Sequence, residues 1–200
     1  MKTYHDYVIK DGCFIGKFDE MYQSVDQPWM QDQQPNPYAR YAGICHIQKF
    51  GIRSLVECGS GLGYYSEAIY RQTGIIPQGF DISETAVQKA KALFPHLNFT
   101  VDTVQNLAAY KDLDAILFAE ITWYVLPDLN NLFALMKEHF ANKYLIHNLV
   151  FYKGTQQYGT EYFTNLQEFI KFVPFKLVGY CEATTDQEST IETSTIFKIE

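Results

Sequence analysis

Residues 55–69 read LVECGSGLGYYSEAI and decide the fold of this chain. A short apolar run ends in the acid Glu57, three glycines follow at alternate positions, and helix-period residues resume with Ala68 and Ile69. This order predicts a strand, a tight turn and a helix. Glycine tolerates positive φ and has no Cβ, so it lets a ligand lie against the backbone. Because open α/β sheets bind small molecules at the carboxyl ends of their strands, the turn is the candidate ligand site. Its glycines are Gly59, Gly61 and Gly63.

The composition limits the possible classes of function. With 200 residues, of which 47% are hydrophobic, the chain can bury one core and is short for two, so we expect a single domain. The net charge of −7 opposes a nucleic-acid surface and favours a neutral or cationic small-molecule substrate. The four cysteines form no C-x-x-C pair, which indicates reduced thiols in the cytoplasm rather than a zinc site or disulfides. No apolar run approaches the roughly 20 residues that span a bilayer, and no signal peptide is visible, so no membrane contact is expected.

The rest of the chain alternates between predicted helices and strands. Apolar residues at helical spacing predict helices over 13–25 and 38–50 before the glycine turn, and Asn36 can cap the second. Strand and helix alternate five times, and a hairpin-like pair of strands closes the chain. This order predicts an α/β fold with a doubly wound, seven-stranded, mostly parallel Rossmann-like sheet. The strands after the first are predicted at 75–80, 99–101, 114–119, 144–148, 176–183 and 191–199, and the later helices at 83–93, 128–140 and 164–173.

The spacing of the glycines separates two classes of ligand. A dinucleotide fingerprint, G-x-G-x-x-G, would place its third glycine at position 64, which is Tyr64. The third glycine stands at 63 instead and gives E-x-G-x-G-x-G, with a second acid, Asp81, at the end of the next predicted strand. Over residues 50–200 this pattern resembles class I S-adenosylmethionine-dependent methyltransferases.

The flanking segments carry a narrower resemblance. KFDEMYQSVDQPW at 17–29, NPYARY at 36–41 and AEITWYVLPDL at 119–129 are similar to the nodulation-type N-methyltransferases, which methylate a free amine on a chito-oligosaccharide. In those relatives the last segment has Ser-Glu and then a Tyr-Tyr pair, whereas this chain has Ala-Glu and then Trp-Tyr. The resemblance implies an amine as the methyl acceptor.

The resemblance also implies a cofactor, S-adenosylmethionine, with S-adenosylhomocysteine as product. It implies a helical cap, residues 1–50, over a core of residues 51–200. Asp81 would accept hydrogen bonds from both ribose hydroxyls, although a helix-capping role near Ser83 is the alternative. Glu57 would orient the turn or meet the cofactor's ammonium group through water, and Ile82 would pack on the adenine. The other expected cofactor-binding residues are the three turn glycines, Asp102, Thr103 and Val104 after the third strand, and Glu120 and Ile121 after the fourth.

Two residues at strand ends are candidate catalytic groups. Glu120 could attract a protonated amine or take its proton, although a loop-stabilising carboxylate is the alternative. His147 could act as a general base near neutral pH, unless strand alternation points it into the flank of the sheet. Aromatic residues of the cap could hold a methylsulfonium or a substrate ring by cation–π contact. The candidate substrate-binding residues are Tyr22, Trp29, Tyr38, Tyr124 and Asn148, and no metal site is predicted.

The sequence therefore predicts a methyltransferase that acts on a small molecule, with an amine such as an amino sugar preferred. An O-methyltransferase of a phenol or carboxylate is one alternative, and it would depend strictly on His147 or Glu120. A nicotinamide-dependent oxidoreductase is a second, which the position of Gly63 opposes. A regulatory module that binds the cofactor without catalysis is a third.

Overall fold

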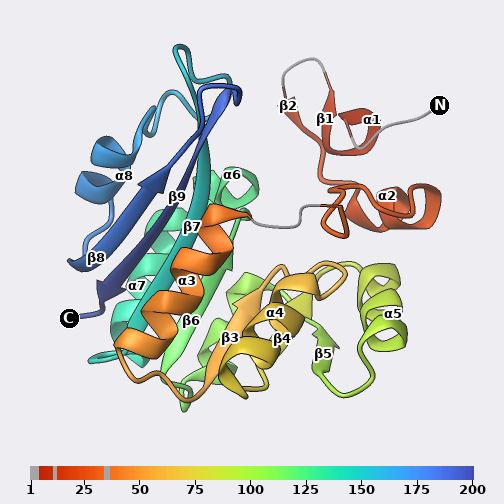
Figure 1. Ribbon diagram of the computed structural model, residues 1–200, viewed down its shortest axis with the longest axis horizontal. Helices are drawn as coiled ribbons and strands as arrows, with labels where there is room; N and C mark the ends of the chain where they lie inside the picture. The colour runs from red at the N-terminus through yellow and green to blue at the C-terminus, as the bar shows by residue number, and fades with distance from the viewer. Residues whose placement is uncertain (1–4, 11–12, 34–36) are drawn as a thin grey trace.

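The computed structural model describes residues 5–10, 13–33 and 37–200. The strands of its main sheet are β3 (Leu55–Cys58), β4 (Gln78–Asp81), β5 (Asn98–Val101), β6 (Ala115–Ala119), β7 (Tyr144–Tyr152), β8 (Lys176–Ala183) and β9 (Thr190–Lys198). They lie in the order β5-β4-β3-β6-β7-β9-β8 (Figure 1). The first five are parallel, and β9 is antiparallel to both of its neighbours. The predicted doubly wound sheet with a closing antiparallel pair is confirmed.

Helices cover both faces of this sheet. On one face, α3 (Tyr38–Lys49) and α4 (Tyr64–Thr73) bury an aliphatic cluster against β3, β6, β7 and β9. On the other face, η1 (Val104–Tyr110), α7 (Leu129–His139) and α8 (Leu166–Phe172) form the larger and more aromatic half of the core. Figure 1 shows α3 and α4 in front of the sheet and α7 behind it. Because successive side chains of a strand point to opposite faces, β3, β6, β7 and β9 contribute to both clusters.

The parallel register brings the candidate residues to one edge. Cys58 pairs with Phe80 and with Phe118, and Phe118 pairs in turn with His147. The glycine turn, the segment after β4 and the segment after β6 therefore leave the sheet side by side. The short helices α6 (Thr122–Val125) and η2 (Leu126–Asp128) follow β6 at this edge, and α5 (Glu84–Leu93) follows β4. The Ser83 hydroxyl accepts from Ala86 N–H at 3.0 Å and caps α5, as expected for this residue type.

The N-terminal segment differs from its prediction. It contains α1 (His5–Val8), a two-stranded hairpin of β1 (Ile9–Lys10) and β2 (Cys13–Phe14), and α2 (Phe18–Ser24). The helix predicted over 13–25 therefore begins only at Phe18, because Gly16, at φ +63°, turns the chain between β2 and α2. The predicted cap residue Asn36 lies outside the described residues, and Pro37 precedes α3. In the described part of the chain, no helix has the length and apolar character needed to cross a membrane.

Candidate functional site

The glycine turn joins β3 to α4 at the carboxyl edge of the sheet. Gly59, Gly61 and Gly63 have φ of +70°, +54° and +82°, a region that residues with a Cβ rarely adopt. The Ser60 N–H donates to the Phe80 carbonyl at 2.8 Å and ties the turn to β4. A Cβ on any of the three glycines would lie 2.8 Å or less from another side chain, so backbone conformation and packing both require glycine. The facing side chains are Ile121 at Gly59, Tyr22 at Gly61 and Phe99 at Gly63.

Asp81 links the turn to the start of α5. One carboxylate oxygen accepts from Gly61 N–H and the other from Ser83 N–H, both at 2.9 Å. The residue is 8% exposed, and burial raises the pKa of its carboxyl group although three backbone N–H groups oppose the shift. Each carboxylate oxygen has a second lone pair, so Asp81 retains acceptor capacity toward a diol. The cap of α5 is Ser83 itself, so the alternative role expected for Asp81 belongs to its neighbour.

Glu57 is enclosed beneath the turn. It is 2% exposed and accepts a hydrogen bond from the Ser66 hydroxyl on α4. Burial raises the pKa of Glu57 to about 7, while Ser66 and the Arg40 charge oppose the rise. Because it bonds α4 directly, Glu57 fixes the helix to the end of β3, which fits the loop-orienting role expected of it.

The residues expected to contact adenine lie in the segments after β4 and β5 and have different surroundings. Ile82, 52% exposed, presents an apolar surface beside buried Asp81. Val104 is buried in the core at the start of η1. The Asp102 carboxylate is occupied by three donors of its own segment, the Thr103 N–H, the Asn106 amide and the Tyr110 hydroxyl, at 2.8 to 2.9 Å. The Ile82 side chain is therefore accessible at the carboxyl edge of the sheet, whereas the Asp102 carboxylate is occupied by hydrogen bonds at the start of η1.

Glu120 lies at the mouth of the site, directly after β6. Its backbone has φ of +62°, an uncommon conformation for a residue with a side chain, and its N–H donates to the Asn148 carbonyl at 3.1 Å. The residue is solvent-exposed on one side. Desolvation of the carboxyl group by the surrounding protein is the main cause that raises the pKa of Glu120, and the charge of Glu192 on β9 is the second. The charge of Arg40 opposes the rise. A carboxylate with a raised pKa is suited to exchange a proton with an amine.

The structure does not bring His147 to the mouth of the site. Its side chain is 1% exposed, its Nε2 bonds the Thr122 hydroxyl, and its ring lies 4.3 Å from that of Phe169 on α8. Burial lowers the pKa of His147 to about 3. Alternation along β7 points it toward α8 and away from α3 and α4, so it does not fit the general-base role expected for it.

Asn148, expected to bind substrate, is a structural residue here. It is 1% exposed, and its Nδ2 donates to the Ala39 carbonyl and to the Tyr65 hydroxyl, both at 3.1 Å. Its Oδ1 accepts from the Ser194 hydroxyl at 2.8 Å. Both ends of the amide are therefore occupied by the protein.

Aromatic residues from three segments gather around Tyr124. Its ring centroid lies 5.2 Å from Phe14, 5.1 Å from Phe18 and 6.1 Å from Trp29, and Phe14 is 5.9 Å from Tyr158. The Phe14–Tyr124 and Phe18–Tyr124 pairs are edge-to-face and the other two pairs are tilted, and together these rings form an apolar wall. Trp29 and Tyr124 were expected at the site, whereas Phe14, Phe18 and Tyr158 were not. The remaining two candidates for substrate binding, Tyr22 and Tyr38, differ in their exposure. Tyr22 is buried, and its hydroxyl accepts a hydrogen bond from the Trp29 indole N–H at 3.0 Å. Tyr38 is 46% exposed at the start of α3.

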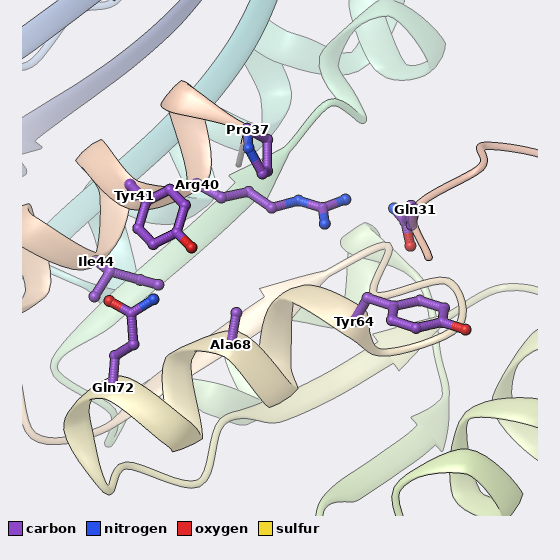
Figure 2. Close-up of a pocket in the computed structure, with 8 residues that line it drawn as sticks. All are labelled: Gln31, Pro37, Arg40, Tyr41, Ile44, Tyr64, Ala68 and Gln72. Carbon is purple, nitrogen blue, oxygen red and sulfur yellow. The ribbon is translucent and has the colours of Figure 1, made fainter. Parts of the chain in front are cut away.

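Arg40 is a further residue of the site that was not expected from the sequence. It extends from α3 across a pocket of about 140 Å³ toward Gln31 and the start of α4 (Figure 2). Its guanidinium carbon lies 5.7 Å from the centroid of the Tyr65 ring. No ion pair joins Arg40 to a carboxylate in the described part of the chain. The pocket is lined by Gln31, Pro37, Arg40, Tyr41, Ile44, Tyr64, Ala68 and Gln72.

Comparisons with known proteins identify the fold. The sequence matches no protein-family model and no curated protein. The structure is similar to that of the N-methyltransferase NodS from Bradyrhizobium japonicum in complex with S-adenosyl-L-homocysteine, with a TM-score of 0.68, 14% identity, and coverage of 90% of this chain and 98% of that one. It is also similar to the plantazolicin methyltransferase BpumL in complex with the same compound (TM-score 0.61, 15% identity, 90% and 91% coverage).

A TehB-like S-adenosylmethionine-dependent methyltransferase from Corynebacterium glutamicum gives a TM-score of 0.60 at 16% identity, with 89% and 97% coverage. At these identities the likeness is one of fold, and it extends over nearly the full length of each of these proteins. The mostly parallel seven-stranded sheet and its closing antiparallel pair are those predicted from the alternation of strands and helices. The chain has the fold of class I S-adenosylmethionine-dependent methyltransferases.

Proposed function

We propose that this chain transfers a methyl group from S-adenosylmethionine to the amine of a small molecule. The observation that carries the proposal is the position of Asp81, at the tip of β4 and bonded to the glycine turn. This is the crevice in which open α/β sheets bind their ligands. Relatives in fold crystallised with S-adenosylhomocysteine support the choice of cofactor.

The residues present fit an adenosyl cofactor. Asp81 would hold the ribose, and exposed Ile82 would pack on the adenine. Ser60 Oγ in the turn and Gln27 Oε1 in the cap are buried with no hydrogen-bond partner in the described structure, so both remain available to a polar ligand. Arg40, which has no carboxylate partner there, would bind the cofactor's carboxylate as a charge-assisted pair.

The acceptor would enter beside Glu120. The cofactor supplies a methyl group on a sulfonium, which is already activated toward nucleophiles. Glu120 would attract the ammonium form of the acceptor and remove its proton, and the aromatic wall around Tyr124 would exclude water. Alignment of nucleophile and methyl group can contribute roughly 7–11 kcal/mol to such a step.

Because His147 is buried, Glu120 is the base on which the O-methyltransferase alternative would depend, and the choice of acceptor distinguishes the two functions. The open side of Glu120 favours an enzyme over a purely regulatory module. The free thiols of Cys45, Cys58 and Cys181 suit the reducing cytoplasm.

The proposal is tested by following methyl transfer from S-adenosylmethionine, labelled on its methyl group, to panels of amines (amino sugars included), phenols and carboxylates. We expect transfer to amines, and a large loss of kcat in Glu120→Gln. Glu138→Gln, which changes an exposed carboxylate on α7, is the matched control and should retain full activity. Transfer confined to hydroxyl or carboxylate acceptors would refute the amine assignment, and transfer to none would favour the regulatory module.

A further inference from the structure

The first turn of α3 is held by side chains from three other elements. The Ala39 N–H donates to the Glu192 carboxylate of β9 at 2.9 Å, and the Ala39 carbonyl accepts from Asn148 of β7 at 3.1 Å. The next carbonyl, that of Arg40, accepts from the Tyr65 hydroxyl of α4 at 3.1 Å. The peptide groups on either side of the Arg40 side chain are therefore fixed.

We call Glu192, Asn148 and Tyr65, which hold the first turn of α3, the clamp. Its side chains are closely packed. Gly43, one turn further along α3, gives the Tyr65 hydroxyl room, because a Cβ at position 43 would lie 2.1 Å from it. Asn148 is itself held by Ser194 and by Tyr65. The side chains of Asn148 and Tyr65 are thus themselves fixed by packing or hydrogen bonds.

The same clamp reaches Glu120. The Asn148 carbonyl accepts the Glu120 N–H at 3.1 Å, while the Asn148 side chain holds Ala39. One residue of β7 therefore sets the distance between the loop that carries Glu120 and the helix that carries Arg40. Glu192 lies opposite Val150 on the neighbouring strand, and its charge acts on Glu120.

We propose that Asn148 and Glu192 are positioning residues of the acceptor site, which fix Arg40 relative to Glu120, and that the charge of Glu192 makes the site selective for a cationic amine. This inference rests on the proposed function. The charged and titratable groups that face Glu120 are Glu192 from β9, Arg40 from α3 and Tyr65 from α4. With two carboxylates and one guanidinium, the cluster has a net negative charge when all three are ionised, which attracts an ammonium group.

Two substitutions of one residue separate the hydrogen bond from the charge. Glu192→Gln keeps an oxygen for the Ala39 N–H and removes the charge, whereas Glu192→Ala removes both. Glu182→Gln, an exposed carboxylate on the adjacent strand β8, is the matched control. The readouts are the dissociation constant of S-adenosylhomocysteine, the pH profile of kcat/KM for an amine, and hydrogen exchange at the Ala39 amide.

In Glu192→Gln we expect the acidic limb of the pH profile to move to lower pH, because the ionised form of Glu120 loses a repulsive neighbour. Binding of S-adenosylhomocysteine and exchange at Ala39 should stay within twofold of wild type. In Glu192→Ala the limb should move in the same direction, exchange at Ala39 should accelerate, and the dissociation constant should rise roughly twofold to tenfold, as for the loss of one hydrogen bond. The control should change none of the three.

An unmoved acidic limb in Glu192→Gln would overturn the role of the charge. Unchanged exchange and unchanged S-adenosylhomocysteine binding in Glu192→Ala would overturn the clamp. Failure of the proposed function is distinguishable, because wild-type protein would then neither bind S-adenosylhomocysteine nor transfer a methyl group, while hydrogen exchange at Ala39 would still report on the clamp.

Discussion

The hydroxyl of Tyr22 lies directly against the backbone of Gly61, so that a Cβ on Gly61 would stand 2.8 Å from it. Tyr22 belongs to α2, and Gly61 is the centre of the turn between β3 and α4. The contact therefore joins α2 to the cofactor side of the proposed site. It also means that Gly61 serves two purposes, a positive φ and a close approach by a side chain.

Gly61→Ala should lower the free energy of unfolding by more than Gly51→Ala does. Both positions have positive φ, +54° and +63°, but no atom lies within 4 Å of a Cβ at Gly51. The backbone strain common to both should amount to about 1–2 kcal/mol. Denaturant unfolding checks the difference, which should become smaller when both variants are made in a Tyr22→Phe background that lacks the hydroxyl. Equal losses in the two single variants would show that Tyr22 does not press on the turn.

Asp19→Ala should loosen the attachment of α2 to α5. One Asp19 oxygen accepts from the Ser83 hydroxyl at 2.7 Å and from Thr85 N–H at 2.9 Å, which attaches α2 to the first turn of α5. Loss of a capping carboxylate of this kind is worth about 0.5–2 kcal/mol. We expect that decrease in unfolding free energy and faster proteolysis within α2. Glu20→Ala, which removes an exposed carboxylate of the same helix, is the control, and equal effects would contradict the assignment.

Asp19 also predicts a pH dependence. The Thr85 N–H and the Ser83 hydroxyl lower the pKa of Asp19, so its contribution is present above its ordinary value of 3.8 and is lost as pH falls through the folded-state value. The stability difference between wild type and Asp19→Ala should therefore shrink in acid. A difference that is constant down to low pH would exclude this carboxylate as the attachment.

Glu57→Gln should change how stability depends on pH. Because the folded pKa of Glu57 is raised from 4.5 to about 7, its favourable contribution is complete below 4.5 and is lost as pH rises through about 7. Ionising it in the folded protein costs about 3 kcal/mol. Glutamine keeps an acceptor for Ser66 and cannot ionise, so the variant should gain stability relative to wild type between pH 5 and 8. Parallel melting curves across that range would contradict a buried, neutral Glu57.

His147→Leu should damage folding but not the chemistry. The substitution leaves the buried Thr122 hydroxyl without its partner, at a cost of about 1–3 kcal/mol. Combining it with Thr122→Val should recover part of that loss. At a temperature where the variants remain folded, kcat and its pH profile should match wild type. A loss of activity with an altered pH profile would restore His147 as the base.

Much of the fold could be predicted from local sequence. The strands are short apolar runs that end in polar residues, and the Ser83 cap of α5 and the glycine turn have local signals. The helix predicted from apolar spacing over 13–25 was wrong in its first part, where the structure has β2 and Gly16. One residue with positive φ outweighed the periodicity there.

The site was less predictable, because its geometry depends on residues distant in sequence. Ala39 and Glu192 are separated by 153 positions, and no local pattern joins them. The direction of His147 depended on the register of β7, because a shift of one residue would exchange its face with that of Asn148. Arg40 carried a weak signal as a basic residue in the first turn of the helix before β3, and only the structure shows it across a pocket.

The most direct test of the central claim is a calorimetric titration of wild type, Asp81→Ala and the control Asp112→Ala with S-adenosylhomocysteine. Asp112 is exposed and lies in the turn before β6, away from the glycine turn. We predict micromolar binding to wild type and to Asp112→Ala, and at least about tenfold weaker binding to folded Asp81→Ala, equivalent to about 1.4 kcal/mol. Equal affinity in all three, or binding of NAD in place of S-adenosylhomocysteine, would contradict the account.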